Sequence, residues 1–330
     1  GQMTGAAVST MDDVRRTRTG IYNEFITRVR EYYAQRNTPV NLCYWGSDTI
    51  SFEPWVGQKI LTDMIKESGR VSLFLESRVL KAKTEKNRVV SALIESGGEK
   101  MTIAAKVFID ATETGDFIPL TGARYRVGNS IAPKVDKESV IQDITYVAVV
   151  KRYPEGLPPE LRLTRRPPGY EDFLPHFRKV ITKDGSWWPG EYPFNVPVHN
   201  AYRAMPDITN PDRERIDGGL SGTWPLISRT GVNWANDYPG RKFGAAGMPV
   251  KYLEDKKFRR EAERRAMAET LAFIFYMQTE LGMEDWSVDD RQGYGRYFSN
   301  NWRDWKEMPA EFVPVLTHFP PFPYVRESRR

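Results

Sequence analysis

Residues 110–123 read DATETGDFIPLTGA, a run of small and polar residues that leads into a short apolar stretch. The apolar residues 107–109 before it are typical of a strand, and a helical stretch after it ends at Gly122. Such a strand–turn–helix junction directs backbone N–H groups towards an anion, and small residues let a ligand approach the backbone. Two interpretations follow: a ligand-binding bend, or an ordinary turn in which Asp116 caps the helix.

Helices and short strands are expected before this junction. Apolar residues, among them Ile21 and Phe25, recur at helical spacing from about residue 12 to 37, and again from Pro54 to Gly69. Residues 71–75 have the composition of a short strand. Turn residues then separate residues 79–84, 89–95 and 101–109, so we expect a three-stranded antiparallel β-meander whose last strand runs into the junction.

The chain changes character after about residue 131. Proline and aromatic residues are dense up to about residue 245, where we expect a loop-rich region with one strand over residues 142–150. The longest helix is predicted over residues 249–282. Its first half is rich in lysine and arginine, which suits an anionic partner, but the interspersed Glu261 and Glu263 favour a solvated face.

Three stretches of the chain resemble the FAD-dependent oxidoreductases among the glutathione-reductase-like flavoproteins. Residues 1–12 resemble a glycine-rich loop of that family, residues 110–123 its strand-to-helix turn, and residues 324–330 the segment that returns to the cofactor domain. The resemblance implies an α/β (α+β) fold in which a partial FAD-binding Rossmann-like domain carries the β-meander. It assigns residues 1–130 and 305–330 to that domain, and residues 131–304 to an inserted substrate-binding domain.

The resemblance also implies FAD as the cofactor and hydride transfer from a small organic substrate as the reaction. On this basis the flavin or the pyrophosphate lies beside Gly1, Gln2 and Thr4. The other side of the cofactor is lined by four residues of the junction, namely Ala111, Thr112, Gly115 and Asp116.

The chain departs from the family pattern in three ways. Glu113 stands where the more general turn, Ala-Thr-Gly, has its glycine. The fingerprint Gly-x-Gly-x-x-Gly after a strand is absent, and so is the acidic residue that would bind ribose. We therefore expect an interior fragment of a longer flavoprotein, without the N-terminal fingerprint and the C-terminal segment, that binds FAD weakly or not at all and is inactive alone.

Several polar residues are candidates for the substrate site. His199 and His318 are candidate catalytic bases, because a substrate alcohol or amine needs a proton acceptor, although a lone histidine is more often structural. Asn233 and Asp237 suit a polyhydroxylated ligand or form a plain turn. Arg326 suits a substrate carboxylate or a cofactor phosphate, or pairs with Glu327 at the surface.

Composition limits the other classes of function. The formal net charge of +5 is spread along the chain, which does not indicate a nucleic-acid partner. One cysteine and three histidines make a disulfide impossible within the chain and a zinc site improbable, so we expect no metal. No apolar run is long enough to span a bilayer, and we expect a cytoplasmic protein whose oligomeric state the sequence does not indicate.

Two other functions remain open from the sequence. The first is a non-catalytic carbohydrate- or ligand-binding module that uses exposed tryptophan and tyrosine side chains, which the missing nucleotide fingerprint favours. The second is a flavin monooxygenase on the same fold. The leading prediction is FAD-dependent oxidation of a small organic molecule such as a sugar derivative or an organic acid.

Overall fold

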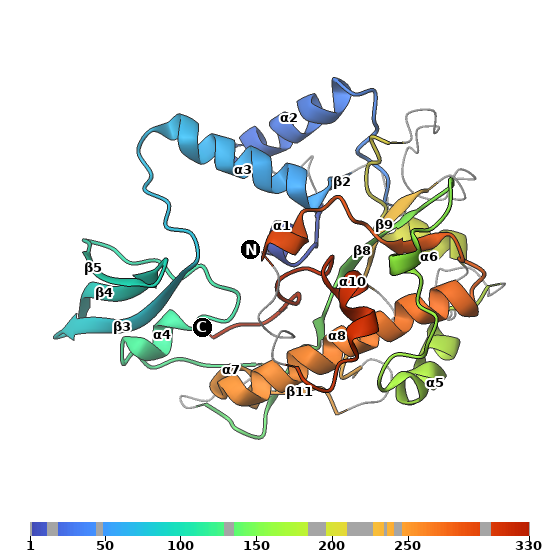
Figure 1. Ribbon diagram of the computed structural model, residues 1–330. Helices are drawn as coiled ribbons and strands as arrows, with labels where there is room; N and C mark the ends of the chain where they lie inside the picture. Colours follow the sequence, from blue (N-terminus) through green and yellow to red (C-terminus); the bar gives the residue numbers. More distant parts are fainter. Residues whose placement is uncertain are drawn as a thin grey trace.

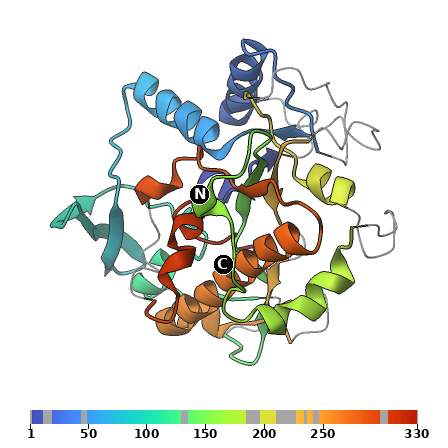
Figure 2. The ribbon, with the colours of Figure 1, turned by 45° about the vertical axis from the view of Figure 1, so that its right-hand side comes forward.

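The computed structural model describes residues 2–11, 19–43, 49–128, 135–183, 196–209, 227–233, 236–240, 246–297 and 305–329. The long helix α8 (Lys256–Thr279) crosses the body of the molecule, and short strands and loops surround it (Figure 1). A β-meander projects at the edge of the molecule in both views (Figures 1 and 2). Helices and strands are mixed, in agreement with the predicted α/β (α+β) class.

The two predicted N-terminal helices are confirmed where the structure describes them. They are α2 (Gly20–Ala34) and α3 (Pro54–Ser68), which pack together around a small apolar cluster. Proline fits the first turn of α3, and Gly69 ends this helix with a φ of 62°, which costs glycine little. Ile21 is 75% exposed, so the predicted apolar stripe does not reach the start of α2.

The three-stranded meander is also confirmed. Strand β4 (Arg88–Ser96) lies between β3 (Ser77–Glu85) and β5 (Glu99–Ala104), and both pairings are antiparallel. The short helix α4 (Phe117–Leu120) packs beside β3, where Oγ1 of Thr84 donates a hydrogen bond to the Thr121 carbonyl oxygen at 3.0 Å. The meander therefore holds the junction in place.

Two strand predictions were wrong. Residues 71–75 form no strand, and β5 ends at Ala104, so residues 106–110 form none either. Their apolar side chains lie in solvent instead, with Val107 73% and Ile109 85% exposed. A continuous apolar run becomes a strand only where a neighbouring strand pairs with its backbone. No described residue pairs with these two runs, although their composition is that of strands buried on both faces.

The central sheet contains β8 (Ala148–Arg152) between β12 (Trp286–Val288) and β9 (Arg229–Val232). The predicted strand over residues 142–150 is interrupted, since β7 (Ile144–Thr145) turns away to pair with β10 (Asp237–Tyr238). Every pairing among the described strands is antiparallel, so a Rossmann-like sheet stays a prediction. Two-stranded ladders join β1 (Thr10–Met11) to β2 (Ile50–Ser51) and β6 (Val140–Ile141) to β11 (Met248–Pro249).

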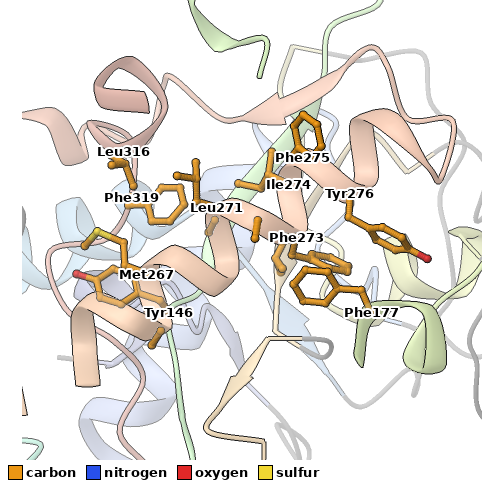
Figure 3. Close-up of a cluster of buried hydrophobic side chains, with 14 of the residues drawn as sticks. Tyr146, Phe177, Met267, Leu271, Phe273, Ile274, Phe275, Tyr276, Leu316 and Phe319 are labelled. Carbon is orange, nitrogen blue, oxygen red and sulfur yellow. The ribbon is translucent and has the colours of Figure 1, made fainter. Parts of the chain in front are cut away.

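The predicted helix over residues 249–282 consists of α7 (Lys251–Glu254) and α8, with Asp255 between them. The Asp255 carboxylate accepts the N–H groups of Lys257 and Phe258 and caps α8. The apolar second half of α8 forms the main core with aromatic and aliphatic residues of the loop-rich region, including Tyr146 and Phe177 (Figure 3). The remaining short elements are α1 (Gln2–Gly5), η1 (Pro159–Leu161), α5 (Tyr170–Val180), α6 (Val196–Tyr202), η4 (Tyr294–Tyr297), η5 (Ala310–Phe312) and α10 (Val313–Leu316).

Candidate functional site

Residues 322–329, which we name the return segment, connect three regions in which the sequence places site residues. The segment pairs with β7, since the backbone groups of Thr145 and Tyr324 exchange hydrogen bonds of 3.1 and 2.7 Å. The next carbonyl oxygen, of Val325, accepts a hydrogen bond from Nε2 of Gln2. Further along, the segment reaches the junction beside α4 (Figure 1).

Helix α1 is packed tightly against the return segment. A side chain at Gly5 would clash with the Phe322 ring, because a Cβ there would lie 2.2 Å from Cζ of that ring. The Thr4 carbonyl oxygen accepts a hydrogen bond of 2.8 Å from the Tyr294 hydroxyl. Gln2 and Thr4, both predicted to lie beside the cofactor, are therefore held in fixed positions. Gly1 lies outside the described residues.

The junction satisfies its own backbone N–H groups. Oδ1 of Asp110 accepts the N–H of Thr112 at 3.0 Å, and Oδ2 accepts the N–H of Phe117 at 3.0 Å. Oγ1 of Thr112 accepts the N–H groups of Gly115 and Asp116 at 3.0 and 3.3 Å. The Asp110 carboxylate thus occupies the position at the start of α4 that an anionic ligand would take, and these four N–H groups are not directed at a phosphate.

Asp116 occupies the N-cap position of α4, as one interpretation expected, but its side chain makes no capping hydrogen bond. Its carboxylate binds two arginines instead. Nη1 and Nη2 of Arg259 lie 2.7 and 2.9 Å from the carboxylate oxygens, and Nη1 of Arg329 lies 2.6 Å from Oδ1. Burial alone would raise the pKa of Asp116, but the hydrogen bonds and charges of the two guanidinium groups outweigh it and hold the pKa well below its usual range.

Gly115 lies under the return segment. Its φ is +64°, and a Cβ at this position would approach Cβ of Arg329 to 3.0 Å. The Arg329 guanidinium donates to the Thr114 carbonyl oxygen at 2.9 Å and to the Glu254 carboxylate at 3.0 Å. The small residue is therefore required here by the return segment, while Ala111 and Thr112 remain exposed on the other side of the bend.

The structure brings together the three residues predicted to bind substrate. Nη2 of Arg326 lies 2.8 Å from Oδ1 of Asp237 and 3.5 Å from Oδ1 of Asn233. Nη1 of Arg326 donates to the Asp143 carbonyl oxygen at 2.6 Å. The alternative partner of Arg326, Glu327, instead accepts the N–H of Gln142 at 2.7 Å. Asp237 also accepts a hydrogen bond from the Thr145 hydroxyl.

Glu269 lies behind this group on α8 and is only 4% exposed. Its Oε2 has no hydrogen-bond partner among the described residues. Burial raises the pKa of Glu269, and the negative charges of Asp237 and Asp143 raise it further, which favours the protonated carboxyl. Sequence reasoning missed Glu269, although a single acidic residue within the apolar half of a helix is a recognisable signal.

Comparison with known protein families decides the class of this chain. The family model for FAD dependent oxidoreductases matches residues 1–330. The chain belongs to the FAD dependent oxidoreductase family. Its cofactor is therefore FAD, and its activity is that of a flavin oxidoreductase. Neither a curated protein nor a solved structure gives a significant match.

The described residues of this FAD dependent oxidoreductase fit the flavin part of the cofactor better than its pyrophosphate. Ala111 and Thr112 present a small, exposed surface, and Gln2 is partly exposed on α1. The bend, however, has already bound four of its N–H groups internally, which leaves little for the pyrophosphate. These residues therefore suit contact with the uncharged flavin ring and its chain.

Neither candidate histidine of the flavoprotein contacts the return segment through a hydrogen bond between described residues. His199 is buried beside Phe273, with 5.4 Å between the ring centroids, and burial lowers its pKa to about 4. Burial also lowers the pKa of His318, while Asp290 and Asp289 partly oppose this shift. Both imidazoles are therefore neutral at physiological pH, and their catalytic roles stay predictions.

A second buried charge cluster ties α3 to the central sheet of the flavoprotein. Nη1 of Arg229 lies 3.0 Å from Oε1 of Glu53 and 3.1 Å from Oδ1 of Asp207, and its Nε lies 2.6 Å from Oδ2 of Asp289. The Tyr33 hydroxyl of α2 donates to Glu53 at 3.1 Å. The start of α3, β9 and the end of β12 thus share one guanidinium, a long-range relationship that the sequence did not indicate.

The described residues of the flavoprotein contain neither a metal site nor a membrane span. No group of three or more histidine, cysteine, aspartate or glutamate side chains in these ranges could hold a metal ion. No helix in the same ranges is long and apolar enough to cross a membrane. Cys43 is buried, and its thiol lies 3.7 Å from the Ala204 carbonyl oxygen.

Proposed function

We propose that the protein oxidises a small polar organic molecule by hydride transfer to FAD, with the flavin beside α1 and the junction and the substrate beside Arg326. The observation that carries this proposal is the position of two adjacent residues of the return segment. Val325 accepts a hydrogen bond from Gln2 on the proposed flavin side, and Arg326 binds Asp237 and Asn233 on the proposed substrate side. Flavin and substrate would thus meet across the return segment.

The chain would contribute orientation and a proton acceptor. FAD supplies the oxidant when it is bound, because it takes up the hydride of a substrate C–H bond. The remaining proton, from an O–H or N–H group of the substrate, needs an acceptor within hydrogen-bond reach. Asp237 is partly exposed and lies in the proposed substrate site, so it joins His318 and His199 as a candidate.

Six of the residues assigned to the cofactor divide into two roles in this proposal. Gln2, Thr4, Ala111 and Thr112 would line the flavin. Gly115 and Asp116 would act indirectly, because they fasten the bend to the return segment and to α8 through Arg329 and Arg259. Both groups of residues then depend on the same short segment for their relative positions.

We further propose that the nucleotide half of the FAD cradle is completed by a strand–turn–helix unit outside residues 1–330, as in glutathione-reductase-like flavoproteins. The support is the surface left by residues 71–75 and 107–109, two apolar runs that no described strand covers. A strand carrying a glycine-rich turn would bury these side chains and supply the N–H groups for the phosphates. In this proposal residues 1–130 and 305–330 belong to the FAD domain and residues 131–304 to the substrate domain.

The proposal is tested by purifying residues 1–330 alone and a longer protein with its native flanking sequences, and recording the flavin absorbance of each. We expect bound FAD in the longer protein, and weak or no binding of added FAD by residues 1–330. Anaerobic bleaching of the flavin by a substrate then identifies an oxidoreductase, and incorporation of labelled oxygen into the product separates a monooxygenase from an oxidase. A longer protein that is colourless and takes up no added FAD would contradict the proposal.

A further inference from the structure

The guanidinium of Arg326 is already engaged by the protein. Its Nη2 binds the Asp237 carboxylate at 2.8 Å, and its Nη1 binds the Asp143 carbonyl oxygen at 2.6 Å. The Arg326 guanidinium also lies over the Tyr324 ring, with Cζ 4.4 Å from the ring centroid. An incoming carboxylate would have to displace Asp237 to reach this positive charge, so Arg326 is a poor receptor for an organic acid.

Three acidic side chains lie near Arg326. Asp237 stands beside it on β10, Asp143 precedes β7, and Glu269 lies behind both on α8. The ladder between Asp237 and Thr145 and the hydrogen bond of 2.8 Å from Asn236 Nδ2 to Thr270 Oγ1 hold these three elements together. The preceding turn of α8 carries two further cations: Arg265 is 61% exposed and lies 3.7 Å from Glu261, and Arg264 lies over the Trp305 ring.

Two buried hydrogen-bond acceptors near Arg326 also favour a ligand that donates hydrogen bonds. Oε2 of Glu269 and Oδ1 of Asn236 are buried, and neither has a hydrogen-bond partner among the described residues. A buried acceptor without a donor costs free energy, which a ligand rich in N–H or O–H groups would recover. Within the described chain these two oxygens near Arg326 therefore lack a hydrogen-bond donor, which a ligand could supply.

We propose that the substrate of this flavoprotein is a cationic, polyhydroxylated amine, bound by Asp237 with Glu269 behind it, and that Arg326 is a positioning residue rather than an anion receptor. This inference rests on the proposed function, because it assigns a substrate class to the same site. The ammonium group pairs with the Asp237 carboxylate, and the hydroxyl groups donate to the free acceptors. Arg326 keeps Asp237 oriented and fastens the return segment over β7.

Binding of a cation has a measurable consequence at Glu269. In the free protein, burial and the charges of Asp237 and Asp143 raise the pKa of this carboxyl and favour its protonated form. An ammonium ion placed beside it favours the ionised form, so part of the Glu269 population releases its proton when the ligand binds. A residue with only a packing role would release none.

Three matched probes test the inference: glucamine, glucitol and gluconate, which carry the same hydroxylated chain and end in an ammonium, a hydroxyl or a carboxylate group. Binding to the FAD-loaded protein is measured by calorimetry in buffers of different ionisation enthalpy, which reports affinity and proton release together. We expect glucamine to bind at least about tenfold more tightly than gluconate, with glucitol between them, because one charge contact contributes about a factor of ten. Glucamine binding should release protons.

The variants separate the roles of the individual residues. Asp237→Asn should remove the preference for glucamine over glucitol, and Glu269→Gln should abolish the proton release while it keeps the fold. Asp63→Asn, which changes an exposed acid paired with Lys59, is the control and should bind all three probes as the parent protein does. The inference is overturned if glucamine is not preferred over gluconate, whether gluconate binds better or neither binds.

Failure of this inference is distinguishable from failure of the proposed function. The flavin absorbance of the protein reports the proposed function, whereas calorimetry reports the probe affinities with or without flavin. A yellow protein that prefers gluconate would retain the flavoenzyme assignment and reject the amine. A colourless protein that takes up no FAD would reject the flavoenzyme assignment, whichever probe it binds.

Discussion

Nη1 of Arg329 lies 2.6 Å from Oδ1 of Asp116, although 213 residues separate the two along the chain. Asp116 also binds Arg259 of α8, so one carboxylate joins the junction, the long helix and the return segment. The same segment binds Gln2 through Val325, four residues earlier. The relative positions of the proposed flavin side and substrate side therefore depend on a few charge-assisted hydrogen bonds.

The first prediction concerns Arg329. Arg329→Met removes hydrogen bonds to Asp116, Thr114 and Glu254 while it keeps most of the buried stem. We expect a loss of about 2 kcal/mol in the free energy of unfolding, measured by urea denaturation, because charge-assisted hydrogen bonds contribute on that order. Arg28→Met, which breaks an exposed pair with Glu67, is the matched control and should leave the midpoint unchanged. Equal effects of the two substitutions would contradict the bracing role of Arg329.

The second prediction concerns the buried cluster at Arg229. Arg229→Met leaves Glu53, Asp207 and Asp289 without their shared guanidinium, and we expect a destabilisation of about 3–5 kcal/mol at pH 7.5. The unpaired carboxylates would then have raised pKa values in the folded variant, which binds more protons than its unfolded state. The destabilisation should therefore shrink as the pH falls towards 5. A loss that is independent of pH would show that packing, rather than charge, is responsible.

The sequence predicted the elements whose signals are local. Helix α3 has proline in its first turn and glycine after its last, and the turns of the meander are marked by polar residues and glycine, so both were predicted correctly. Residues 71–75 and 106–110 were predicted wrongly, because a strand also needs a partner that the described chain does not provide. Helix α5 went unnoticed within the loop-rich region, although its buried residues recur at helical spacing.

The candidate site was predictable in part. Asn233, Asp237 and Arg326 were chosen from their chemistry, and the structure places them together, but their binding role stays a prediction. The sequence carried no signal for the partners of Arg229, which come from three separate segments. The internal use of the N–H groups of the junction was equally hidden, because it depends on the conformation of Asp110 and Thr112.

The third prediction concerns His199. Its pKa is lowered by burial to about 4, below the usual value of 6.5, so the folded state favours the neutral imidazole. The resulting stability is fully present above pH 6.5 and is lost as the pH falls from 6.5 to 4, up to about 3 kcal/mol. His199→Phe should reduce this acid sensitivity in thermal melts at pH 7.5 and 4.5. Retention of flavin reduction by this variant would exclude His199 as the catalytic base, whereas its loss with an intact fold would support that role.

The fourth prediction compares two glycines with the same backbone conformation. Gly115 and Gly97 have φ values of 64° and 57°, but only Gly115 has neighbours that a Cβ would meet, above all Arg329. Gly97→Ala should cost about 1 kcal/mol from the backbone alone. Gly115→Ala should cost more and should also speed amide hydrogen exchange in residues 325–329, because the return segment is pushed away. Unchanged exchange there would show that the segment is not held by this contact.

The last prediction concerns the apolar runs that no described strand covers. Ile109 and Ile21 are 85% and 75% exposed, but only Ile109 belongs to a run with the composition of a buried strand. In residues 1–330 alone, Ile109→Lys should reduce self-association in sedimentation experiments more than Ile21→Lys, because an uncovered strand-like run is a pairing template. In a longer protein that completes the sheet, Ile109→Lys should be harmful, because it would bury a charge, lower the stability and weaken FAD binding. Ile21→Lys should leave the stability and FAD binding of that protein unchanged. If both variants bind FAD and unfold as the parent does in the longer protein, residues 107–109 are not covered by a cofactor-binding strand.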